Sequence, residues 1–161
     1  MTRKVVFVAL LVAMLALLGA TAVSADTGAG QAKTAGTVVI RGTGTLSAQG
    51  AGVAWLNGSG NIFIRGHGLA TIYVRNADRI VASGAGRRLN LRNGITLFVG
   101  WRGTVDVAGD HMSVRIQGGL IDFTATGTGR AVLPGRGHYQ LGDQAGDWNP
   151  ASTSVEYSEA Q

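Results

Sequence analysis

Between Gly36 and Gly68 the chain repeats an eight-residue pattern in which every even-numbered residue is glycine or apolar. The four units read TVVIRGTG, TLSAQGAG, VAWLNGSG and NIFIRGHG. Alternation with a period of two is typical of a β-strand that buries one face. Glycine provides the positive φ angles that tight connections need. The repeat therefore predicts an all-β fold of short strands separated by G-x-G turns, with the even-numbered side chains in a common interior.

The repeat is compatible with two architectures. In a β-solenoid, or β-helix-like fold, two units would form one coil of about sixteen residues and the coils would stack. In an antiparallel β-sandwich or barrel, successive units would instead pair with each other. Both arrangements preserve the alternation through a turn. We favour the solenoid, because the period is short and glycine recurs at inward positions, and keep the sandwich or barrel as the alternative.

We assign residues 36–142 to this β-repeat domain. Strict alternation returns from Ile121 to Gly137, and no part of the domain shows the 3.6-residue period of a helix. The segment from Asn76 to Arg92 is less regular. Residues 143–161 are acidic and show no period, so we expect a loosely ordered tail there, which Trp148 could dock onto the domain.

The first 25 residues have the features of a signal peptide. Arg3 and Lys4 precede an uncharged apolar run, and the run ends in the small residues Val23-Ser24-Ala25. Residues 26–35 are small and polar, as in a flexible linker. We therefore expect an exported protein that is secreted, periplasmic or at the cell surface. If the segment is retained, it would act as a membrane anchor.

The charges and the lack of cysteine narrow the possible functions. The sequence contains no cysteine, which excludes disulfides and thiol chemistry. Between Gly36 and Gly142 there are eleven arginines and only four acidic residues. A basic exported surface favours an anionic glycan or a cell-wall polymer as partner, and nucleic acid is not expected. The arginines could also simply shield strand edges.

One set of residues could form a basic and aromatic surface. Arg41 and Arg65 occupy equivalent outward positions three units apart, and Arg75 has the same parity. Aromatic side chains lie near them at odd-numbered positions. Such a surface suits sugars or phosphates, although arginine stems packed across aromatic rings would give the same pattern. The candidate binding residues are Arg41, Trp55, Phe63, Arg65, Tyr73 and Arg75.

We predict no catalytic residue, metal site or cofactor. The densest polar cluster contains Asp106, Asp110 and His111, and with Asp122 it could bind a hard cation or provide paired acids. A small glycan lyase or hydrolase would use Asp106, Asp122 and Arg115. However, Asp106 and Asp122 alternate with apolar residues, as expected for carboxylates on the solvent face of a strand. We find no P-loop, no nucleophile elbow and no zinc-protease motif. The histidines, His67, His111 and His138, lie in or near turns.

The segments GSGNIFIRGHG and GTVDVAGDHMSVRIQGGLIDFTATGTGRAVLPGRGHY resemble exported glycine-rich β-repeat proteins of high-GC bacteria. They also resemble the auto-transporter adhesin head domain, which is built on G-x-G and alternating apolar residues. The resemblance covers roughly residues 36–139, and the segment from Asn76 to Arg92 departs from it. It implies a β-helical cell-surface module without catalytic residues.

Our leading hypothesis is therefore a non-enzymatic, exported cell-envelope protein that acts as a structural or adhesin-like surface module. The alternative is a module that binds carbohydrate or another anionic polymer. Since a solenoid has open ends and a sandwich has open edges, self-association is possible in either case.

Overall fold

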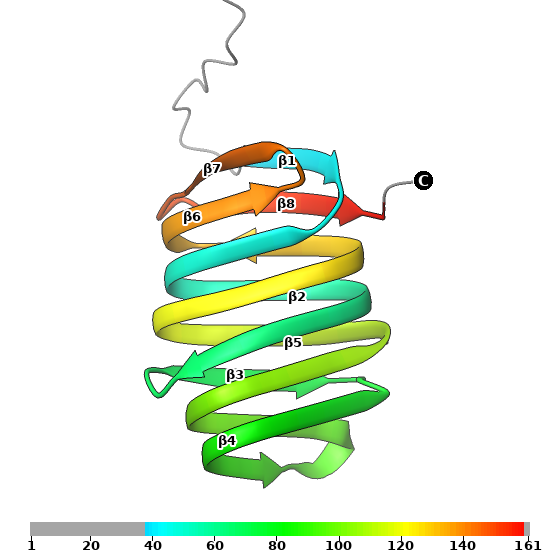
Figure 1. Cartoon of the computed structure of the whole chain (residues 1–161), viewed down its shortest axis with the longest axis vertical. Coiled ribbons are helices and arrows are strands. Elements are labelled where there is room, and N and C mark those ends of the chain that lie inside the picture. The colour runs from blue at the N-terminus through cyan, green and yellow to red at the C-terminus, as the bar shows by residue number, and fades with distance from the viewer. Residues whose placement is uncertain (1–37, 160–161) are drawn as a thin grey trace, which may run out of the picture. The chain divides into compact units, whose positions relative to one another are not determined.

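The computed structural model describes residues 38–159, and these form an all-β fold, as predicted (Figure 1). The expected signal peptide and linker lie outside the described residues. Apart from the short 3₁₀ turn η1 (Arg92–Gly94), the regular elements are strands. They are β1 (Val38–Thr43), β2 (Leu46–His67), β3 (Ala70–Arg75), β4 (Arg79–Asn90), β5 (Ile95–Leu133), β6 (Gly135–Leu141), β7 (Gln144–Trp148) and β8 (Thr153–Ser158). No helix among these residues has the length and apolar character needed to cross a membrane.

The chain forms one long hairpin that is wound into a coil around its own core. The first half runs from β1 to β4, reverses at η1, and returns as β5 between the turns already laid down (Figure 1). Thr124 of β5 shows this arrangement, because it pairs with Ser47 on one side and with Phe63 on the other. Ser47 and Phe63 are sixteen residues apart in β2, so sixteen residues make one turn of the coil.

The structure thus combines features of both expected architectures. The sixteen-residue coil is the one anticipated for a solenoid. The pairing of β2 with β5, however, is antiparallel, as in the barrel alternative. Successive eight-residue units do not pair with each other; they form opposite halves of a turn. The strands stacked between turns of the first half come from the returning second half: β5 lies between two turns of β2, and both β8 and β5 lie between β1 and β2.

The interior of the coil is apolar, as the alternation predicts. In β2 the even-numbered side chains Leu46, Leu56, Ile62 and Ile64 are buried. Side chains of β5 and β8, such as Phe123 and Val155, complete the same core. Burying this apolar surface is the main term that stabilises the fold, since the chain has no disulfides.

Glycines meet across strands where the coil bends. Gly60 pairs with Gly127, and Gly58 with Gly129. The space left by missing side chains is filled by large aromatic residues elsewhere: a Cβ atom on Gly50 or Gly137 would collide with the indole of Trp148. The G-x-G motifs are therefore corners, two in each turn, rather than hairpin loops.

The segment from Asp143 is not the loose tail that we expected. It contributes β7, which pairs with β6, and β8, which lies between β1 and β5. Trp148 is only 3% exposed, and its indole Nε1 donates a hydrogen bond to the carbonyl oxygen of His138. Val155 and Tyr157 alternate into the core. The tail is ordered because it supplies apolar side chains and strand partners to the open end of the coil.

Candidate functional site

The six candidate binding residues lie on two opposite sides of the coil. Trp55 and Tyr73 pair with the same residue, Arg115, from its two sides, so they are one turn apart and share a side. Phe63 is eight residues from Trp55, which is half a turn. We call the two sides the Trp55 face and the Phe63 face.

The arginines divide in the same way. Arg41 pairs with Glu156, Glu156 with Arg130, and Arg130 with Asn57, which lies two residues from Trp55. Arg75 pairs with Ser113, and Ser113 pairs with Asn57 on its other side, so Arg75 belongs to the same row of outward side chains across the strands. Arg41 and Arg75 therefore lie on the Trp55 face. Arg65 lies two residues from Phe63 and shares its face, because three eight-residue units make one and a half turns.

The central feature of the Trp55 face is a stack of three side chains. The guanidinium of Arg115 lies 5.7 Å from the ring centroid of Trp55 and 5.9 Å from that of Tyr73. Its Nη2 donates a hydrogen bond of 2.7 Å to Oε1 of Gln117, which fixes the group between the rings. Trp55 is 41% exposed and Tyr73 38% exposed. The stack therefore presents a pre-arranged aromatic and cationic surface to solvent.

From the sequence, Arg115 is associated with the acidic cluster, and Gln117 and Arg130 are not singled out. The alternation in Ser113-Val114-Arg115-Ile116-Gln117 predicts that the side chains of Arg115 and Gln117 point outward. It does not show which strand lies beside them. The partners of Arg115 are sixty and forty-two residues away along the chain, and only the strand pairing brings them together.

The two faces differ in charge. On the Trp55 face, Glu156 is the acidic residue among the outward side chains of the described strands. The outward arginines there are Arg41, Arg75, Arg87, Arg115 and Arg130. On the Phe63 face, by contrast, carboxylates lie beside the arginines: Asp122 near Arg65 and Asp106 near Arg79, with N–O distances of 3.9 and 3.7 Å. The Trp55 face is therefore the one whose field attracts anions.

The residues of the lyase or hydrolase hypothesis do not come together. Asp106 and Asp122 lie on the Phe63 face, whereas Arg115 lies on the opposite face. Oδ2 of Asp122 is 3.5 Å from Nε2 of His67 and also faces Arg65. The cations nearest to these carboxylates are thus Arg65 and Arg79 of the same face.

The Phe63 face has a polar groove of its own, of about 480 Å³. It lies beside the contact of Arg65 with Asp122 and extends over Gln49 to His138. Nδ1 of His138 is hydrogen-bonded to a carboxylate oxygen of Asp147. Among residues 38–159, no three histidine, aspartate or glutamate side chains are grouped in a way that could hold a metal ion.

Three aromatic residues are buried and contribute to packing in the core: Trp101, Tyr139 and Tyr157. Trp101 lies in β5, packs edge-to-face against Phe98 and belongs to the buried core. Burial raises the pKa of Tyr157 to about 12. Burial, and then the charge of Asp147, raise the pKa of Tyr139 above its ordinary value. Both tyrosines are therefore neutral at physiological pH.

In comparisons with protein-family models, curated proteins and solved structures, no match to this chain was found.

Proposed function

We propose that this protein is a non-enzymatic module, exported to the cell envelope, that binds an anionic glycan or cell-wall polymer with its Trp55 face. The observation that carries the proposal is the exposed stack of Trp55, Arg115 and Tyr73 on a face where arginines outnumber acids. Aromatic rings provide flat apolar surfaces for sugar rings. Guanidinium groups bind carboxylates and phosphates with paired hydrogen bonds.

The spacing of the stack favours a chain-like ligand. Trp55 and Tyr73 lie on either side of the β5 strand that carries Arg115, so they are separated by two strand spacings, about 9.6 Å. A polymer that crosses the strands would meet a ring, a guanidinium and a second ring in turn. An isolated small molecule would contact only part of this row.

Glycan binding by the Trp55 face would be the chemical basis of the structural or adhesin-like role expected from the sequence. A coil of antiparallel strands with a packed core presents its outward side chains on a rigid surface. Such a surface can hold a polymer without any change of shape. Export is proposed from the signal-like residues 1–25.

Titration with a polyuronate, with an uncharged polysaccharide as control, tests the proposal. We expect saturable binding of the polyuronate that weakens as salt is added, since exposed charges are screened. Trp55→Ala should weaken binding about tenfold, as loss of a central aromatic contact commonly does.

Phe63→Ala is the matched control. Phe63 is 40% exposed, close to the value for Trp55, but lies on the opposite face. We expect this variant to bind like the wild type. Equal losses in both variants, or no saturable binding by the wild type, would contradict the proposal.

A further inference from the structure

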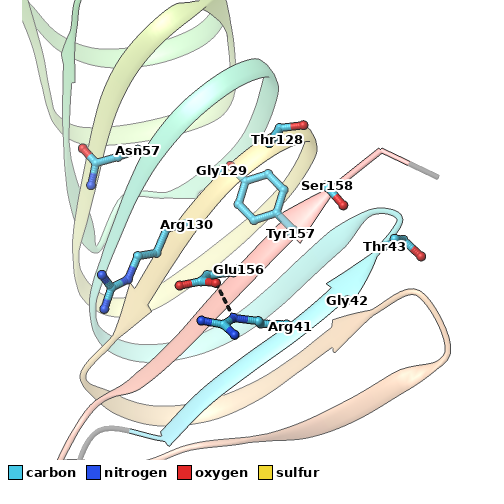
Figure 2. Close-up of a pocket in the computed structure, with 10 residues that line it drawn as sticks. All are labelled: Arg41, Gly42, Thr43, Asn57, Thr128, Gly129, Arg130, Glu156, Tyr157 and Ser158. Carbon is cyan, nitrogen blue, oxygen red and sulfur yellow. Dashed lines mark hydrogen bonds and ion pairs between the residues drawn. The ribbon is translucent and has the colours of Figure 1, made fainter. Parts of the chain in front are cut away.

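A groove of about 750 Å³ lies on the Trp55 face, across β1, β8 and β5 (Figure 2). Along each of these strands, one lining residue is charged and the lining residue two positions away carries a hydroxyl. The charged side chains are Arg41, Glu156 and Arg130, and the hydroxyl side chains are Thr43, Ser158 and Thr128. Because each set spans neighbouring strands, the groove runs across the strands, along the axis of the coil.

The residues between the two sets leave the floor of the groove bare. Gly42, Gly129 and Tyr157 all face the core, so no side chain rises from the middle of the groove. A Cβ atom on Gly129 would lie 2.7 Å from the hydroxyl oxygen of Tyr157, so this ring packs beneath the backbone. The floor is therefore flat main chain, which a ring-shaped ligand can approach closely.

The charges of the groove suit a ligand unit with one negative charge. Nε of Arg41 donates a hydrogen bond of 2.6 Å to Oε2 of Glu156. Nε of Arg130 donates one of 2.8 Å to Oγ of Ser154. Each guanidinium retains further N–H donors. Two arginines and one glutamate leave a net charge of +1, with hydroxyl groups facing them across the groove.

We propose that this groove is a subsite for an acidic sugar, with its single carboxylate bound by Arg130 and Arg41 and its hydroxyls bound by the threonine and serine side. This inference rests on the proposed function, because it makes the groove part of the same glycan site. Asn57 lines the groove and lies two residues from Trp55 in β2. From Arg41 to Arg75 the row crosses five strand spacings, about 24 Å. The site thus accepts several linked sugars lying along the coil axis.

Substitution of Glu156 tests the subsite through an expected gain, not a loss, of ligand affinity. Glu156 competes with a bound carboxylate for Arg41 and repels it. Glu156→Gln should therefore tighten binding of a long oligogalacturonide, by about threefold for an exposed pair. Arg130→Gln should weaken the same binding by about fivefold, because it removes charge-assisted hydrogen bonds. Loss of folding cannot produce the first result.

Ligand length and anion type separate the remaining possibilities. A short oligogalacturonide that covers only the Trp55, Arg115 and Tyr73 stack should bind both variants like the wild type. A glycerol-phosphate polymer that binds better than the long oligogalacturonide would show that phosphate, not an acidic sugar, is the ligand, and would overturn the inference. Unchanged affinity of both variants for the long oligogalacturonide, with binding still lost in Trp55→Ala, would overturn the subsite but not the proposed function. Absence of binding to every anionic probe would overturn both.

Discussion

Gly60 and Gly127 face each other at a corner of the coil, on neighbouring strands, with no side chain between their backbones. A Cβ atom on Gly60 would collide with the carbonyl oxygen of Thr126, and one on Gly127 with that of Ser59. The two residues have φ angles of 126° and 119°, which L-residues rarely adopt. The close approach of the strands and the strained backbone both require glycine.

Gly127→Ala should therefore destabilise the fold. We expect a loss of about 2 kcal/mol or more in the free energy of unfolding, from the disfavoured φ angle and the clash together. Gly119→Ala is the control, because a Cβ atom added at Gly119 would have no neighbouring atom within 4 Å. It should change stability by less than about 0.5 kcal/mol. Denaturant unfolding of the two variants measures the difference, and similar losses would contradict the corner assignment.

The C-terminal strands should be required for stability. Trp148→Ala removes a buried indole that packs against Gly50 and Gly137, and we expect a loss of about 3–5 kcal/mol. Leu69→Ala removes a side chain that is 66% exposed and should cost little. Thermal unfolding followed by circular dichroism compares the two. If Trp148→Ala unfolds at the wild-type temperature, the segment from Asp143 does not contribute to the core.

Alanine substitutions at two adjacent residues of β2 should have opposite effects on stability and on glycan binding. Leu56 is buried, and Leu56→Ala should cost about 2–5 kcal/mol of stability without a direct effect on ligand affinity. Trp55 points outward, and Trp55→Ala should cost about 1 kcal/mol or less while it weakens glycan binding. Paired unfolding and binding measurements test this division. A large stability loss in Trp55→Ala would mean that the ring is mainly a packing residue.

Stability should fall in strong alkali. The folded protein raises the pKa of Tyr157 from 10.0 to about 12, so it holds this proton more tightly than the unfolded chain does. The resulting stabilisation is complete below about pH 10 and is lost as the pH rises toward 12. Tyr139, whose pKa is also raised, should add to the effect. Tyr157→Phe should reduce the slope of stability against pH above pH 10, and an unchanged slope would exclude Tyr157 as its source.

The repeat predicts the local structure because its causes are local. Alternation places Leu46, Leu56 and Ile64 in the interior, and glycine marks the bends; both results follow from the period of a strand and the sterics of a turn. The partners of each strand do not follow from the repeat. Ser47 and Thr124 are joined by a hydrogen bond across seventy-seven residues, and no pattern in either segment specifies the other.

For the candidate site, too, the sequence predicts the direction of each side chain but not its neighbours. The outward direction of Trp55, Phe63 and Tyr73 follows from parity, but their division between two faces depends on the number of residues in a turn. Once a turn of sixteen is known, the eight residues between Trp55 and Phe63 place them on opposite sides. The strand at Thr153–Ser158 is not predicted although Val155 and Tyr157 alternate, because the segment is short and has no glycine repeat.

The long hairpin has a consequence for the order in which the chain can fold. Every pairing partner of β2 lies beyond residue 101, and the partner of β1 among the described strands is β8, which begins at Thr153. A chain delivered from its N-terminus therefore has no native pairing for its first strands until its last ones arrive. Apart from the short hairpin of β6 and β7, pairing begins at the turn formed by Arg92–Gly94 and proceeds outward over growing sequence separations, which makes folding slow. The export that we propose would require this property, because a narrow translocation pore passes only an unfolded chain.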